Sequence, residues 1–206
     1  MASLLQSDIS FVVASQTLRI AEGIGMAEAI RGTVWVGRTG RTSLDFYNVF
    51  RRIKDNALLV EGCATIVYLG TNGLPTPLPA RMQQPDPDPP STIDLEPPVF
   101  SNIPQRLFQT PYRVRTSDID LLSHMNHASY GALYEDAMHC ALAVNAYGPG
   151  ISGESRIRFL HIEYANSALL GQKLSAGTWL VSMDPVSLGF VLHCGDTLLS
   201  RAVALL

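Results

Sequence analysis

The stretch Val114-Arg-Thr-Ser-Asp-Ile-Asp-Leu-Leu-Ser-His-Met-Asn-His-Ala-Ser-Tyr-Gly-Ala-Leu-Tyr-Glu-Asp136 decides how this chain folds. It starts as an extended segment, passes two carboxylates at Asp118 and Asp120, and reaches His124 before a helical pattern begins. Apolar residues then recur at helical spacing. They predict one buried helix face, made of Ala128, Ala132, Leu133, Ala137, Cys140 and Ala141.

The ends of this predicted helix carry the usual signals. Asn126 or Ser129 would cap its start, and Gly148 and Pro149 would end it. Two carboxylates and an imidazole therefore precede a helix N-terminus, where backbone N–H groups and the positive end of the helix dipole lie. A carbonyl oxygen could be polarised there while a carboxylate acts on a water molecule.

The spacing Asp118-x-Asp120-x-x-x-His124-x-Asn126-x-x-x-Tyr130, followed by Glu135-Asp136-Ala137, resembles the start of hotdog-fold thioesterases. The similar groups are the 4-hydroxybenzoyl-CoA thioesterases and the acyl-ACP thioesterases. The resemblance implies thioester hydrolysis in lipid metabolism without a cofactor or a metal. It makes Asp120 the general base or nucleophile and His124 its assistant.

The substrate-binding residues that the resemblance implies form one run, namely Asn126, His127, Ala128, Ser129 and Tyr130. A backbone N–H within His127–Ser129 would stabilise the oxyanion. The residue types also allow plainer roles. Asp120 could satisfy backbone N–H groups at the helix start, His124 could be structural, and Asn126 could be a cap. Asp118 is expected to shape the turn. Tyr130 and Tyr134, one turn apart, are expected to pack.

Two positions depart from the plant-type acyl-ACP pattern. Leu122 stands where those enzymes have asparagine, and Ser167 falls near their additional downstream acid. The departures favour acyl-CoA as substrate. Two alternatives stay open. A hotdog hydratase or dehydratase would need an Asp-x-Asn-x-x-His arrangement, in which Leu122 again replaces the asparagine. The second alternative is a non-catalytic module that binds acyl-CoA or assists assembly.

Composition narrows the class of protein. The 206 residues are 47% apolar and 16% charged, as expected for a folded chain with a large core. A net charge of −3 gives no nucleic-acid footprint, and no apolar run has the length of a membrane span. Cys63, Cys140 and Cys194 lack zinc spacing and predict reduced, mostly buried thiols. With no basic leader in Met1–Asp8, we expect an intracellular protein, in the cytoplasm or an organelle.

A proline-rich segment divides the chain. Eleven of the thirteen prolines lie between residues 75 and 111, which predicts a semi-extended linker without a sheet ladder. The domains expected are a partial N-terminal unit at 1–74, this linker at 75–111, and a complete C-terminal unit at 112–206.

The strand patterns of the two units repeat. Gly32-Thr-Val-Trp35 and Thr42-Ser-Leu-Asp-Phe46 correspond to Gly177-Thr-Trp179 and Val186-Ser-Leu-Gly-Phe190, and Leu58–Ala64 corresponds to Leu198–Ala204. The N-terminal unit lacks the motif helix. We therefore predict an α+β protein of tandem hotdog folds, with antiparallel sheets and a central helix in the C-terminal unit. The resemblance further implies that copies associate through their sheets into a homo-oligomer.

The strands are expected at Phe11–Ile20, Thr33–Val36, Thr42–Arg51, Ala57–Leu69, Tyr112–Ser117, Arg156–Tyr164, Gln172–Met183, Ser187–His193 and Thr197–Leu205. Other motifs carry less. There is no G-x-S-x-G elbow, so a serine hydrolase of that type is not indicated. Arg38 and Arg41 could meet CoA phosphates, although a solvated turn explains them. His161 and Glu163 share a strand face and suggest a cross-strand polar pair.

Overall fold

A computed structural model describes residues 10–88, 93–100 and 102–206, and these form two compact units, Met1–Glu96 and Pro97–Leu206. The prediction about Met1–Asp8 lies outside the described residues. The division at Glu96 falls inside the predicted linker. Within the described part, no helix is long and apolar enough to cross a membrane.

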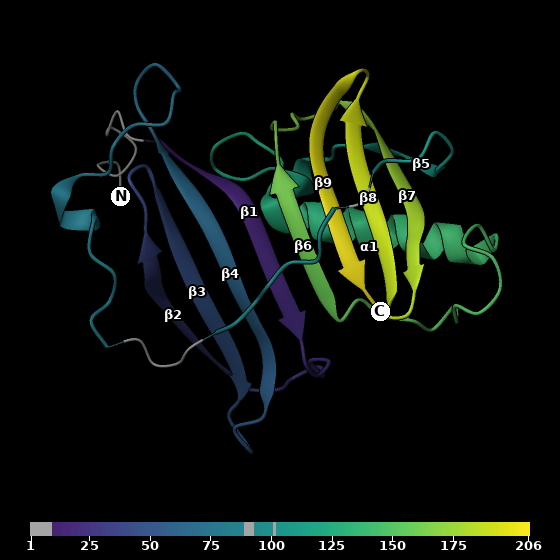
Figure 1. Cartoon of the computed structure of the whole chain (residues 1–206), viewed down its shortest axis with the longest axis horizontal. Coiled ribbons are helices and arrows are strands. Elements are labelled where there is room, and N and C mark those ends of the chain that lie inside the picture. Colours follow the sequence, from purple (N-terminus) through teal and green to yellow (C-terminus); the bar gives the residue numbers. More distant parts are fainter. Residues whose placement is uncertain (1–9, 89–92, 101) are drawn as a thin grey trace. The chain divides into compact units, whose positions relative to one another are not determined.

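The first unit is an antiparallel sheet of four strands, in the order β2-β3-β4-β1 (Figure 1). The strands are β1 (Ser10–Ile20), β2 (Ile30–Thr39), β3 (Ser43–Arg52) and β4 (Leu58–Leu69). β1, β3 and β4 lie within a residue of their predicted ranges, but β2 extends beyond the predicted Thr33–Val36 at both ends. The register pairs Phe46 with Ala64 and Phe50 with Val60, so apolar side chains meet across the strands.

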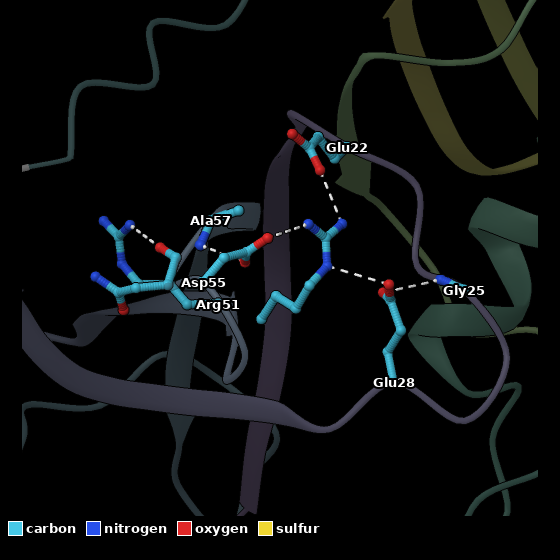
Figure 2. A network of polar contacts seen from close by, with 8 residues as sticks. Glu22, Gly25, Glu28, Arg51, Asp55 and Ala57 are labelled. Carbon is cyan, nitrogen blue, oxygen red and sulfur yellow. Dashed lines mark hydrogen bonds and ion pairs between the residues drawn. The ribbon is translucent and has the colours of Figure 1, made fainter.

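Arg52, at the end of β3, holds together the loops at one end of this sheet. Its partners Glu22, Glu28 and Asp55 are labelled in Figure 2. Its guanidinium pairs with Glu22 at 2.8 Å, Asp55 at 3.0 Å and Glu28 at 3.1 Å. Glu28 also accepts a hydrogen bond from the Gly25 N–H at 3.1 Å. One arginine thus fixes the β1–β2 connection and the β3–β4 turn.

Part of the predicted linker folds along the first unit. It contains the short 3-10 helix η1 (Ala80–Met82), and Leu78 is buried. The Leu78 N–H donates to Arg41 O at 2.9 Å, and the Val36 N–H donates to the Asp86 carboxylate at 3.0 Å. These contacts satisfy backbone groups of β2 and of the turn that follows it.

The second unit has five antiparallel strands in the order β6-β9-β8-β7-β5, and α1 lies across one sheet face (Figure 1). Its elements are β5 (Phe108–Arg113), the 3-10 helix η2 (Thr116–Asp118), α1 (His127–Ala143), β6 (Phe159–Tyr164), β7 (Lys173–Met183), β8 (Val186–Cys194) and β9 (Thr197–Leu205). The α+β class, the antiparallel pairing and the motif helix are confirmed.

Strand β5 corrects the expectation that residues 75–111 contain no sheet ladder. It starts at Phe108, and Pro111 pairs with Ser175 of β7. Because β5 is the edge strand, the missing N–H of Pro111 need not interrupt a ladder on both sides. The strand ends at Arg113, earlier than the predicted Ser117, because Thr116–Asp118 form η2.

The predicted buried face of the helix is partly wrong. Leu133, Ala137 and Ala141 are buried, but Ala128, Ala132 and Cys140 are exposed. The large side chains set the rotation of the helix, and the buried residues are Tyr130, Leu133, Tyr134, Ala137, Met138 and Ala141. The expectation of mostly buried cysteines is therefore wrong for Cys140. Cys63 and Cys194 are half-buried. The helix also ends at Ala143, before Gly148.

Candidate active site at the start of α1

The segment between β5 and α1 is built on the buried carboxylate of Asp118. Asp118 is 4% exposed, and its Oδ2 accepts hydrogen bonds from the Arg115 N–H and the Tyr112 hydroxyl, each at 2.7 Å. The Arg115 guanidinium donates to the Tyr112 hydroxyl at 2.7 Å and pairs with Asp118 at 3.4 Å. The Asp118 carbonyl accepts from the Asn126 N–H at 2.7 Å. The first carboxylate of the motif therefore shapes the segment, as predicted.

Burial acts to raise the pKa of Asp118, but hydrogen bonds from the Arg115 N–H, the Tyr112 hydroxyl and the Arg115 guanidinium outweigh it and lower the pKa. Burial, together with the bond to Asp118, raises the pKa of Tyr112. Asp118 is thus ionised and fully engaged at neutral pH, and has no free capacity to act as a base.

A stability measurement checks this role of Asp118. Because its folded pKa is lowered, the carboxylate stabilises the fold above the ordinary Asp range and loses this effect as pH falls through the folded pKa. Asp118→Asn should lower the free energy of unfolding by about 1–3 kcal/mol at neutral pH, since an amide cannot replace both acceptor oxygens. In urea titrations, the difference in unfolding free energy between Asp118→Asn and wild type should become smaller at acidic pH. Asp196→Asn, at an exposed turn position, is the matched control. An equal loss in both variants would contradict the role.

The second carboxylate lies in a tight turn. The Asp120 N–H donates to His124 O at 2.9 Å, and Asp120 Oδ1 accepts from the Leu122 N–H at 2.8 Å and the His124 N–H at 3.4 Å. Ser123 has φ of 64°, a region uncommon for a residue other than glycine. A bridge between Ile119 and Met125 closes the base of the turn.

The turn leaves one carboxylate oxygen of Asp120 available. Its Oδ1 serves the turn, as the plainer reading expected, whereas Oδ2 has no hydrogen-bond donor among the described residues. Asp120 and His124 are both half-buried, and the contacts between them use backbone atoms of His124 and not its ring. The structure therefore brings the two predicted catalytic residues into one turn without pairing their side chains.

The start of α1 places the predicted substrate-binding run. Asn126 is the N-cap, and its side chain accepts from the Ala128 N–H at 3.0 Å. The Ser129 N–H donates to the Asn126 carbonyl at 2.9 Å. The His127 N–H has no acceptor within the part of the chain described. Of the three N–H groups proposed for the oxyanion, only that of His127 is left to donate to a ligand.

Tyr130 is 2% exposed and packs, as its position one turn from Tyr134 predicts. Its ring meets Tyr164 edge-on at 5.1 Å, and its hydroxyl accepts from the Ala168 N–H at 3.1 Å. Burial raises the pKa of this hydroxyl. The packing explains Tyr130 without a ligand, and its contact with substrate stays a prediction.

The loop at residues 165–172 completes the site, and sequence reasoning missed it. The Ala168 carbonyl accepts from the Met125 N–H at 2.8 Å. Just before the loop, the hydroxyl of Tyr164, the last residue of β6, donates to His127 O at 3.3 Å. Ser167 is exposed beside Ala168, so the position that lacks the expected acid borders the site. These contacts join residues about forty positions apart, and only Ser167 had given a signal in the sequence.

His161 and Glu163 on β6 form a polar group with Arg201 on the neighbouring strand β9, as the cross-strand prediction expected. Glu163 pairs with Arg201 through Oε2, and His161 Nε2 lies 3.9 Å from Glu163 Oε1. Burial, more than the opposing attraction of Glu163, lowers the pKa of His161. Across the described ranges, no group of three or more His, Cys, Asp or Glu side chains could hold a metal ion.

Comparison with known proteins rests on structure alone. No family model and no curated protein matches the sequence. The 12:0-ACP thioesterase from Umbellularia californica superimposes with a TM-score of 0.76, covering 96% of this chain and 73% of that chain at 15% identity. An acyl-ACP thioesterase from Bacteroides thetaiotaomicron gives 0.72, covering 96% and 76% at 18% identity. The chain has a hotdog fold.

The hotdog fold is not restricted to thioesterases. A MaoC-like dehydratase from Phytophthora capsici superimposes with a TM-score of 0.58, covering 95% of this chain and 71% of that chain at 10% identity. Identities this low show a shared fold and leave the reaction to be argued from the residues of this chain.

Proposed function

We propose that this protein hydrolyses an acyl thioester to a free acid and a thiol, and that its substrate is an acyl-CoA. The observation that carries the proposal is the contrast between the two motif carboxylates. The carboxylate of Asp118 is engaged in hydrogen bonds that hold the turn. Asp120, close to the start of α1, has one carboxylate oxygen without a hydrogen bond from the described residues. The fold, shared mostly with thioesterases, supports the same reaction class.

In this mechanism Asp120 Oδ2 takes a proton from a water molecule as the water attacks the thioester carbonyl carbon. The His127 N–H, at the positive end of the helix, donates to the oxyanion that forms. Collapse of the intermediate breaks the C–S bond, and the proton held by Asp120 returns to the thiolate. His124 lies in the same turn and orients the water or the thioester.

Acyl-CoA is the substrate that the departures from the acyl-ACP pattern favour. Leu122 is 58% exposed next to Asp120, and a leucine cannot form the hydrogen bonds of the asparagine that it replaces. Ser167 likewise offers no carboxylate on the neighbouring loop. We further propose that the two units are tandem hotdog units and that copies associate through their sheets.

Thiol release from matched acyl-CoA and acyl-ACP thioesters of short, long and aromatic acyl groups tests the proposal. We expect turnover of at least one acyl-CoA, with acyl-ACP turned over more slowly. Faster turnover of acyl-ACP would contradict acyl-CoA as the substrate and would still support thioester hydrolysis as the reaction. Binding of acyl-CoA by the folded protein without thiol release would indicate the non-catalytic module.

The dehydratase neighbour makes one further assay necessary. Trans-2-enoyl-CoA loses its conjugated double bond on hydration, and this loss is followed by absorbance without thiol release. We expect no hydration, because Leu122 stands where a hydratase would need asparagine. Hydration without thiol release would replace hydrolysis as the function.

A further inference from the structure

Two neighbouring turns of the second unit expose four leucines. Leu121 is 96% exposed and Leu122 58% in the turn Asp120–His124, and Leu169 is 46% and Leu170 58% exposed in the turn Leu169–Gln172. We name these four residues the leucine surface. An exposed apolar patch of this kind marks an interaction site more often than scattered single leucines do.

The two turns project from one base. The N–H of Met125, one residue after the first turn, donates at 2.8 Å to the carbonyl of Ala168, one residue before the second turn. The Gly171 N–H donates to Val114 O at 3.0 Å. The Gln172 N–H closes the second turn on Leu169 O at 3.2 Å. The backbone therefore fixes both tips on the same end of the sheet, although the leucine side chains have no place in the core.

Two cations lie within two residues of the Gly171–Val114 hydrogen bond at this base. Arg113 and Lys173 are exposed and directly opposite each other in the β5–β7 register, and neither forms an ion pair among the described residues. Like charges in opposite register destabilise a sheet unless an anion compensates them. Arg115 adds a third cation, 66% exposed, although Asp118 already neutralises part of its charge.

We propose that the leucine surface and its cations bind the surface of an anionic lipid bilayer. Leucines would enter the boundary between headgroups and acyl chains, and Arg113 and Lys173 would meet the lipid phosphates. Charge complementarity selects this occupant, since the patch combines apolar tips with uncompensated positive charge. The proposal does not depend on thioester hydrolysis, and the assay below needs no turnover.

Flotation with vesicles tests the proposal on the full chain. Vesicles of phosphatidylcholine alone are compared with vesicles that also contain phosphatidylglycerol. We expect the wild-type protein to float with the anionic vesicles, and added salt to weaken the binding because it screens the cations. If the wild-type protein floats with neither kind of vesicle, the proposal is wrong.

Two pairs of substitutions separate the apolar and the charged contributions. Leu121→Ser with Leu170→Ser should lower the affinity for anionic vesicles at least about tenfold, since each removes an apolar side chain from the bilayer boundary. Arg113→Gln with Lys173→Gln should lower it by roughly tenfold or more and reduce its salt dependence. Leu122 is left unchanged because it borders Asp120.

Matched controls lie in the first unit. Leu74→Ser removes a leucine that is 61% exposed, and Lys54→Gln with Arg41→Gln removes two exposed cations. These controls should keep wild-type binding, and circular dichroism should show that every variant is folded. An equal loss in the controls overturns the proposal. So does a leucine variant that floats like wild type but loses self-association, since the surface would then join copies of this chain.

Discussion

The Asp120→Asn protein should hydrolyse acyl-CoA at least about 100-fold more slowly than wild type, with the loss in kcat. An amide cannot take the proton of the attacking water at Oδ2. Its oxygen can still accept from the Leu122 N–H, which Asp120 Oδ1 contacts at 2.8 Å, so the turn should be kept. The substitution thus removes the base and leaves the fold.

Thiol release under saturating acyl-CoA measures this effect. Asp136→Asn is the matched control, because Asp136 is an exposed carboxylate on α1, away from the turn that holds Asp120. The control should keep wild-type kcat, and both variants should unfold at the wild-type temperature. Unchanged turnover in Asp120→Asn would still support thioester hydrolysis but would show that Asp120 is not its catalytic base. A loss confined to KM would assign Asp120 to binding.

Most strands of this fold were predictable because alternation and turn residues are local signals. β1, β3, β4, β7, β8 and β9 lie within a residue or so of the predicted ranges. β5 was misplaced because proline content alone does not tell an edge strand from a linker. Pro111 pairs in β5 only because no further strand follows on that side.

The helix was predictable in position but not in rotation. Alanine occurs on both buried and exposed helix faces, so Ala128 and Ala132 could not predict which face of the helix is buried. Tyr130 and Tyr134 decide the outcome, since their rings are buried and their hydroxyls hydrogen-bond to Ala168 and Ser200, which are distant in sequence. Such partners cannot be read from spacing along a helix.

The candidate site divides in the same way. The Asn126 cap and the shaping role of Asp118 follow from local hydrogen bonds, and sequence reasoning predicted both. The Ala168 loop depends on tertiary contacts and was missed. The catalytic roles of Asp120 and His124 stay predictions, and the structure adds that the free oxygen of Asp120 is Oδ2.

Tyr134→Ala should cost about 3–5 kcal/mol of unfolding free energy, the usual range for removing a large buried ring. Tyr134 is fully buried, its ring lies 5.1 Å from that of Phe190, and its hydroxyl lies 2.6 Å from Ser200 Oγ. The substitution would empty the contact between α1 and the centre of the sheet. A loss this large approaches the total stability of many domains, so urea or thermal unfolding should show the second unit destabilised.

Smaller substitutions separate the contributions of the Tyr134 ring and of its hydroxyl to the unfolding free energy. Tyr134→Phe keeps the ring and should cost about 1–2 kcal/mol, because it leaves Ser200 Oγ without its buried partner. Adding Ser200→Ala to Tyr134→Phe should recover part of that cost, which gives a double-mutant cycle for the 2.6 Å hydrogen bond. Val144→Ala, at an exposed position just after α1, should change stability by less than about 0.5 kcal/mol. A Tyr134→Ala loss no larger than the Tyr134→Phe loss would mean that the ring does not join the helix to the sheet. The site at the helix start would then need another anchor, because the position of Asp120 and His127 depends on where α1 is held.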